Sequence, residues 1–250
     1  GSVDTLLAGT YNGLVKLIRD NHSWKVETKV KGFTESCRFL EQDSDGSIWI
    51  AHGYRGLFHL ELNDDLTMVR SVILYDKGHG LPDKFPYNLN KINNEILIST
   101  REGFFAFNKE RKVFTSQGNY NEIFKDQDFI SEIIKDESGN FWYFSLNKLG
   151  VCRLLEDGSY NNIEIPFYPI NRTLLPTFEN IYLHDKRNIY IGSQNGLIHY
   201  NPEFSVNYKQ ADPVYIREVT FEDPENPVKF LNPPLKGSPD RKTSKDTSQI

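Results

Sequence analysis

The acidic stretch Asp43-Ser44-Asp45-Gly46 is the first candidate for metal chemistry in this sequence. Alternating aspartates before a glycine begin like a calcium loop, but the further ligands ending in Glu that an EF-hand requires do not follow. Asp and Ser in such a stretch more commonly bond their own backbone in a tight turn. The six histidines contain no pair at metal-ligand spacing on one element. We therefore expect a turn here, and neither a metal nor a cofactor.

Residues that could carry catalysis are equally sparse. A nucleophilic serine elbow needs a helix behind it, and no segment shows a helical period of apolar residues. Glycoside cleavage needs two carboxyls facing each other across a cleft. The paired acids Asp64-Asp65 and Asp136-Glu137 lie in predicted turns, where charges are usually solvated. We expect this segment not to be an enzyme.

The composition is that of a chain with a substantial core and no affinity for nucleic acid. Its 250 residues are 38% hydrophobic and 13% aromatic, which suits half-buried strands. The net charge is −5 and no basic run stands out, so nucleic acid is not an expected partner. No apolar run approaches the ~20 residues that cross a bilayer. Cys37 and Cys152 are expected to be buried thiols, and a disulfide between them is the less favoured alternative.

A repeated strand–turn–strand unit must position any site. The five copies read LLAGTYNGLVKL, IWIAHGYRGLFHL, ILISTREGFFAF, WYFSLNKLGVCRL and IYIGSQNGLIHY. Their turn glycines, 43 to 47 residues apart, are Gly13, Gly56, Gly103, Gly150 and Gly196. A period in this range with β-type patterning is typical of propeller arrays. We predict an all-β protein, a β-propeller of four-stranded blades.

Each predicted blade has strands A to D. Strands B and C flank the glycine turn, and strand A precedes B across a polar turn such as the one at Asp43. The weaker strand D follows C, for example at residues 112–114 and 163–165. Copy one begins directly at strand B, so its strand A is missing. Four strands per repeat is the unit of a propeller blade.

The repeat motif resembles the two-component regulator propeller repeats of hybrid histidine kinases of gut Bacteroidetes. The stretch 75–82 (YDKGHGLP) is similar to the segment that recurs between those repeats, and 211–221 (ADPVYIREVTF) is similar to the opening strand of the triple-tyrosine sandwich that follows them. The resemblance implies a non-catalytic, glycan-responsive sensor module in the periplasm, as part of an inner-membrane protein. The implied partners are a glycan or oligosaccharide ligand, neighbouring propeller and sandwich domains, and a second subunit in a homodimer. A sensory propeller of a LuxR-type transcription regulator and a propeller polysaccharide lyase are the alternatives.

The extent of the chain differs from that family. Five repeats are fewer than its usual seven, so we expect an excised segment of a larger propeller. The alternative is a self-closed five-bladed ring in which residues 213–221 supply the missing strand A. We expect blades over residues 3–208. Residues 209–235 are expected to hold a linker and the first strand of a β-sandwich or the ring-closing strand, and residues 236–250 a disordered tail.

A ligand is expected on the face where the B–C turns and D–A connections emerge, because alternating strands bring those loops to one side of the disc. Aromatic rings stack on sugars, and Arg, Asn and Gln donate to hydroxyls or carboxylates. Loops of a propeller are polar in any case, so simple solvation is the competing interpretation for each residue. The candidate ligand-binding residues are Arg38, Tyr54, Arg55, Tyr87, Arg101, Asn147, Lys148 and Gln194.

Overall fold

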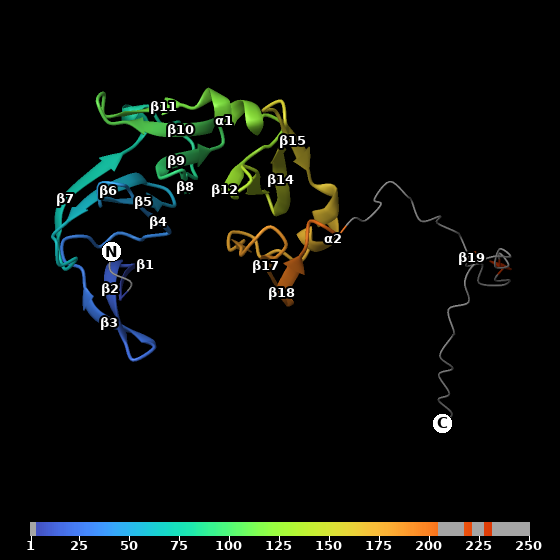
Figure 1. Cartoon of the computed structure of the whole chain (residues 1–250), viewed down its shortest axis with the longest axis horizontal. Coiled ribbons are helices and arrows are strands. Elements are labelled where there is room, and N and C mark those ends of the chain that lie inside the picture. Colours follow the sequence, from blue (N-terminus) through green and yellow to red (C-terminus); the bar gives the residue numbers. More distant parts are fainter. Residues whose placement is uncertain (1–3, 205–217, 222–227, 232–250) are drawn as a thin grey trace. The chain divides into compact units, whose positions relative to one another are not determined.

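The five repeats form five antiparallel sheets in a computed structural model that describes residues 4–204, 218–221 and 228–231. The sheets follow one another around a common centre in chain order, as the blades of a β-propeller (Figure 1). Three sheets have the predicted four strands and two have three. Blade 1 contains β1 Thr5–Thr10, β2 Gly13–Asp20 and β3 Ser23–Lys29. Within the described ranges this blade has no strand A, as expected.

The three middle blades are complete and the fifth lacks strand D among the described residues. Blade 2 comprises β4 Phe39–Gln42, β5 Ile48–His52, β6 Gly56–Leu62 and β7 Val69–Tyr75. Blade 3 comprises β8 Asn88–Ile92, β9 Glu95–Thr100, β10 Gly103–Asn108 and β11 Val113–Ser116. Blade 4 comprises β12 Ile130–Lys135, β13 Phe141–Ser145, β14 Lys148–Leu154 and β15 Tyr160–Ile163. Blade 5 comprises β16 Ile181–Leu183, β17 Ile189–Ser193 and β18 Gly196–Tyr200.

A hydroxyl side chain closes the B–C turn in blades 1, 3 and 5. Thr10 Oγ1, Thr100 Oγ1 and Ser193 Oγ each donate to the carbonyl of the turn glycine at 2.8 Å. The same hydroxyl accepts a backbone N–H from inside the turn. The Ser/Thr of the repeat motif is therefore a turn cap that fixes the hairpin register.

Blade 4 departs from the prediction, because its turn is not at Gly150. Ser145 pairs with Lys148 across the turn Leu146-Asn147, both of which have positive φ, while Gly150 lies within β14 opposite Tyr143. A Cβ on Gly150 would lie 2.3 Å from the Tyr143 ring. Close approach of this ring, and not turn geometry, accounts for the glycine. Lys148 is therefore the blade 4 equivalent of the turn glycines.

Short helices lie in the D–A connections, where the sequence predicted none. They are the 3-10 helices η1 Lys77–His79 and η2 Ile165–Phe167 and the α-helices α1 Gly118–Ile123 and α2 Tyr168–Asn171. Each is at most 6 residues long, too short to show a periodic apolar pattern. The predicted strand D at residues 163–165 was also misplaced, since β15 ends at Ile163 and η2 begins at Ile165.

The core consists of four clusters, and each fills the space between two consecutive blades. The first cluster, for example, joins Leu14 of blade 1 to Ile48, Ile50, Phe58 and Leu60 of blade 2. The others join blades 2 and 3, 3 and 4, and 4 and 5 in the same way. Blades 2, 3 and 4 therefore each pack one face on the next blade in the chain and the other face on the previous one. Burial of these faces holds the disc together.

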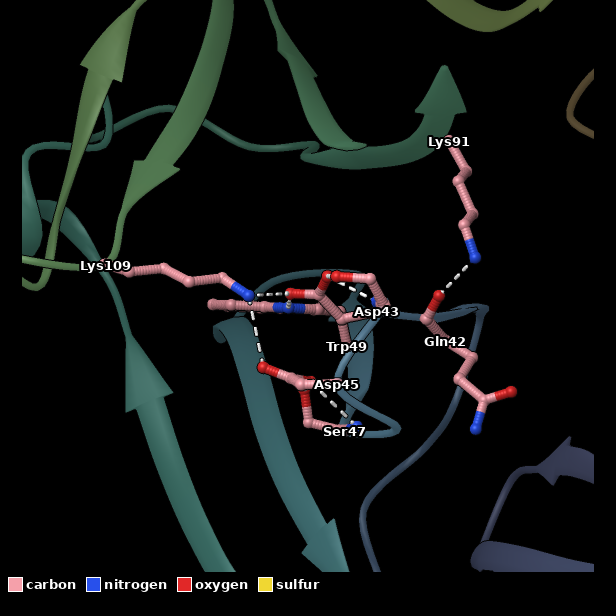
Figure 2. A network of polar contacts seen from close by, with 8 residues as sticks. Gln42, Asp43, Asp45, Ser47, Trp49, Lys91 and Lys109 are labelled. Atoms are coloured by element: carbon pink, nitrogen blue, oxygen red, sulfur yellow. Dashed lines mark hydrogen bonds and ion pairs between the residues drawn. The ribbon is translucent and has the colours of Figure 1, made fainter. Parts of the chain in front are cut away.

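A polar network also ties blade 2 to blade 3 (Figure 2). Lys109 Nζ, from the turn between β10 and β11, lies 3.2 Å from Asp43 Oδ2 and 3.1 Å from Asp45 Oδ2. The backbone N–H groups of Ser44 and Ser47 donate to the same carboxylates at 2.6 and 3.0 Å. The predicted Asx-type turn is thus confirmed, and an ammonium group lies between the carboxylates that resembled the start of a calcium loop. The hydroxyl of Ser47, partly opposed by burial and supported by Lys109, lowers the pKa of Asp45 to about 2.

Residues 206–250 belong to a second unit. Within it, β19 Glu218–Phe221 pairs antiparallel with β20 Val228–Leu231. The predicted strand at 213–221 therefore lies partly within β19. Residues 205–217 and the predicted tail at 236–250 lie outside the described residues.

Candidate functional site

The A strands line the centre of the propeller, and a cavity lies among them. Strands β4, β8, β12 and β16 are edge strands of their sheets, and β8 contacts both β4 and β12. The cavity has a volume of about 370 Å³, within the range of small-molecule sites. It lies where D–A connections and the B–C turn of blade 4 meet, so we call it the channel-mouth cavity. Its lining residues are Arg38, Phe39, Leu40, Glu41, Pro86, Asn88, Leu89, Phe129, Ser131, Glu132, Leu146, Asn147, Thr177, Glu179 and Asn180.

The walls of the channel-mouth cavity combine apolar surfaces with hydrogen-bonding groups. Phe39, Phe129 and Pro86 provide the ring surfaces. The Arg38 guanidinium lies 5.3 Å from the centroid of the Phe39 ring, and amide and carboxylate groups come from other blades. Nine of the fifteen lining residues are polar or charged, so the cavity offers many hydrogen-bonding groups beside a few apolar surfaces.

Carboxylates from blade 2 (Glu41), blade 4 (Glu132) and the connection before blade 5 (Glu179) line the cavity together. Burial, with the nearby charges of Glu179 and Glu41, raises the pKa of Glu132 to about 7. Burial also raises the pKa of Glu41, although the Lys91 ammonium opposes the shift. At neutral pH the cavity can therefore both donate and accept hydrogen bonds through carboxyl groups.

Two of the predicted ligand residues, Arg38 and Asn147, line this cavity. Asn147 lies in the B–C turn of blade 4 with φ 66°, a conformation that asparagine tolerates well. Arg101 lies beside the cavity, because its guanidinium is 5.7 Å from the centroid of the Phe129 ring. The expected proximity of B–C turns and D–A connections is thus present at the mouth of the channel.

The other predicted residues lie elsewhere. Tyr54 is exposed, its ring packed edge-on to His52, and Arg55 pairs with Glu35. Lys148 is exposed at the start of β14, outside the cavity lining. Gln194 uses its side chain to donate to the Leu174 carbonyl at 3.3 Å.

Tyr87 lies in the core instead of on the ligand-facing surface. Its side chain is 2% exposed, and its hydroxyl donates to the carbonyl of Pro82. The ring packs against Phe85, with 4.8 Å between the centroids. This tyrosine fixes the D–A connection of blade 3 and has no free surface for a ligand.

The glutamates and the aromatic rings of the cavity were missed in the sequence, although a signal was present. Glu41 follows Phe39-Leu40, and Glu132 precedes Ile133-Ile134, so each interrupts an otherwise apolar strand A. Burial disfavours a charged side chain on an inner strand, so a glutamate at such a position indicates a role other than packing. The convergence of these residues could not be inferred, because it depends on how the inner strands of three blades meet.

Two further cavities are larger. One of about 760 Å³ shares Glu41 and Glu132 and opens among A–B turn residues such as Asp136 and Ser138. The other, of about 530 Å³, lies between blades 4 and 5. Among the residues that the structure describes, no group of three or more His, Cys, Asp or Glu is arranged to hold a metal ion. Within the same ranges no helix is long and apolar enough to span a bilayer.

The sequence matches no protein-family model and no curated protein. The structure is similar to an extracellular domain of a B. thetaiotaomicron protein assigned to the hybrid two component systems (TM-score 0.49, 23% identity, 78% of this chain and 25% of that one). A second such domain from this organism gives a TM-score of 0.47, 16% identity and coverage of 81% and 28%. For virginiamycin B lyase from Staphylococcus aureus, the TM-score is 0.41 and the identity is 12%, with 80% of this chain and 71% of that one covered. The chain thus spans about a quarter of the two extracellular domains, and at these identities the likeness concerns the β-propeller fold alone.

Proposed function

We propose that this chain is the ligand-binding propeller of an extracytoplasmic glycan sensor, non-catalytic in itself, with the channel-mouth cavity as its binding site. The observation that carries the proposal is the composition of this cavity. The rings of Phe39 and Phe129 supply flat apolar surfaces. Arg38, Asn147 and Asn180 supply hydrogen-bond donors and acceptors around a cavity of about 370 Å³. Sugars present the complementary combination of apolar ring faces and hydroxyl edges.

The ligand that fits best is a small neutral or cationic saccharide. A polyanionic glycan would bring its charges close to Glu41, Glu132 and Glu179, and like charges in a partly buried site repel strongly. The single cationic side chain in the lining is Arg38, at the exposed rim. We therefore expect neutral oligosaccharides to bind better than sulfated or uronate-rich ones.

The signalling role extends the proposal beyond this segment. The repeat motifs described above resemble those of hybrid two-component sensors, in which such a propeller would precede a membrane helix and a histidine kinase. In this proposal the module lies in the periplasm, and its neighbours are further propeller and sandwich domains. The rigid interblade cores imply that a ligand signal would pass through these domain contacts and not through the blades.

Calorimetric titration of the chain with a panel of neutral and acidic oligosaccharides tests the binding. Arg38→Gln should weaken the affinity for a neutral ligand by at least about 10-fold, the usual scale for losing one charged hydrogen bond. Lys148→Gln is the matched control, because Lys148 lies on the same face but outside the cavity lining, and it should leave the affinity unchanged. Equal effects of both variants, or tighter binding of acidic glycans, would refute the site. Release of shortened sugars over long incubation would instead indicate an enzyme.

A further inference from the structure

The side chain of Asn88 brings an unpaired hydrogen-bond acceptor to the channel-mouth cavity. Asn88 is 4% exposed, and its Nδ2 donates to the Ser131 carbonyl at 2.9 Å. No donor in the described part of the chain reaches its Oδ1, whereas Oδ1 of Asn90, two residues further along β8, accepts from the Ile133 N–H at 2.8 Å. Every fully enclosed side-chain N or O of the described residues has a partner. Asn88 Oδ1 therefore faces open space, and the space beside Asn88 is this cavity.

The carboxylate of Glu132, on the inner strand that faces Asn88, also lacks compensation. Burial is the largest influence on its pKa, followed by the charges of Glu179 and Glu41, and all three raise it. The Lys91 ammonium, whose charge acts on Glu41, donates to a backbone carbonyl at 2.6 Å. A cation bound in the cavity would supply the compensation that Glu132 does not receive from the described residues.

The unpaired acceptors lie at the inner end of the cavity. Glu41, Leu89 and Glu132 line both the channel-mouth cavity and the cavity of about 760 Å³, so they lie where the two approach each other. Arg38, in contrast, is exposed at the rim. A ligand must therefore direct donors and positive charge inward and can direct acceptors outward.

The spacing of the acceptors indicates an organic cation and not a metal ion. Among the described residues, no three His, Cys, Asp or Glu side chains converge closely enough to hold a metal. The acceptors instead surround a volume of about 370 Å³, together with the rings of Phe39 and Phe129. A protonated amine has three diverging N–H donors, and a sugar that carries it has a flat face for the rings.

We propose that the channel-mouth cavity recognises a saccharide with a free amino group, whose ammonium is bound at the inner end by Asn88 Oδ1 and the Glu132 carboxylate. The inference rests on the proposed function and narrows its ligand class to amino sugars. Glu41 and Glu179 add attraction at longer range. An N-acetylated sugar lacks the positive charge and two of the three donors, so it does not make this contact.

Three disaccharides with the same backbone test the proposal. They are the disaccharide of glucosamine, its fully N-acetylated form, and cellobiose, which carries hydroxyl groups at the same positions. In calorimetric titration at neutral pH, the free amine form should bind at least about 10-fold more tightly than cellobiose, the usual scale for a hydrogen bond to a charged group. The N-acetylated form should bind no more tightly than cellobiose.

Two variants locate the preference within the protein. Glu132→Gln removes the carboxylate but keeps its shape, and it should reduce the preference for the amine by at least about 5-fold. Glu137→Gln removes one negative charge from an exposed turn of the same blade, outside the lining of the channel-mouth cavity, and should leave the preference unchanged. Circular dichroism of both variants should match wild type.

Equal affinities for the three disaccharides would overturn the amine assignment and leave the proposed glycan site in place. No binding of these disaccharides or of any oligosaccharide in the wider panel would overturn both. A preference that survives Glu132→Gln unchanged, or that falls equally in Glu137→Gln, would show attraction to the net negative charge of the protein and would also overturn the assignment.

Discussion

Glu132→Gln should stabilise the protein above neutral pH and have little effect in acid. The folded environment raises the pKa of Glu132 from its ordinary value of 4.5 to about 7, first through burial and then through Glu179 and Glu41. Between these two values the native state holds a proton that the unfolded chain has lost. The free energy of unfolding therefore falls as the pH rises through this window. Glutamine resembles the protonated acid, so the free energy of unfolding of the variant does not fall in this pH window.

The size of the effect follows from the two pKa values. Each pH unit between them is worth about 1.4 kcal/mol, which gives an upper bound of about 3.5 kcal/mol. The cavity is open to solvent, which screens the carboxylate, so we expect about 1–2 kcal/mol. The Lys91 ammonium, on the neighbouring inner strand, lowers the pKa of Glu41 but is not among the charges that shift the pKa of Glu132.

Urea unfolding followed by tryptophan fluorescence measures the difference. The gain of Glu132→Gln over wild type should be close to zero near about pH 5 and reach its full size near about pH 8. Glu137→Gln, in the exposed turn of the same blade, is the control and should change little between the two conditions. An equal gain at both pH values, or a loss of stability above neutral pH, would refute the electrostatic account of the cavity.

Two further predictions concern the packing. Gly150→Ala should lower the free energy of unfolding by about 2–3 kcal/mol, because its Cβ would lie 2.3 Å from a buried tyrosine ring. Gly53→Ala, whose Cβ would have no atom within 4 Å, should leave the free energy of unfolding nearly unchanged in the same urea titration. Leu149→Ala should lower the free energy of unfolding by about 2–5 kcal/mol, and Leu197→Ala at the equivalent repeat position by less than about 0.5 kcal/mol, measured on dilute monomer; similar losses for the two leucines would show that blade 5 is covered.

Much of the fold could be predicted because its signals are local. The Thr10, Thr100 and Ser193 turns bond within three residues, and the acidic turn at Asp43 bonds within four. Such contacts leave a direct pattern in the sequence. The turn of blade 4 was misplaced because Gly150 imitates a turn glycine, while its cause is a ring on the neighbouring strand. The short helices escaped prediction because six residues or fewer cannot show a period.

The candidate site was predicted only in part, for the same reason. Arg38 and Asn147 were found because they lie in loops of the expected face, and both line the channel-mouth cavity. Tyr87 was also chosen from a loop, but packing turned its ring into the core. Glu132 was missed, because its raised pKa arises first from burial and then from Glu179 and Glu41, which lie far from it in the sequence.

The sequence by itself determined the repeat, the antiparallel strand order and the face on which alternate loops emerge. Each of these depends on hydrogen bonds and side-chain alternation over a few residues. Only the tertiary structure decided which side chains share the central cavity, and that Leu197 is exposed where Leu149, at the equivalent repeat position, is buried. Those properties depend on how separate blades pack around an axis, and residues about 45 positions apart along the chain carry no local record of that packing.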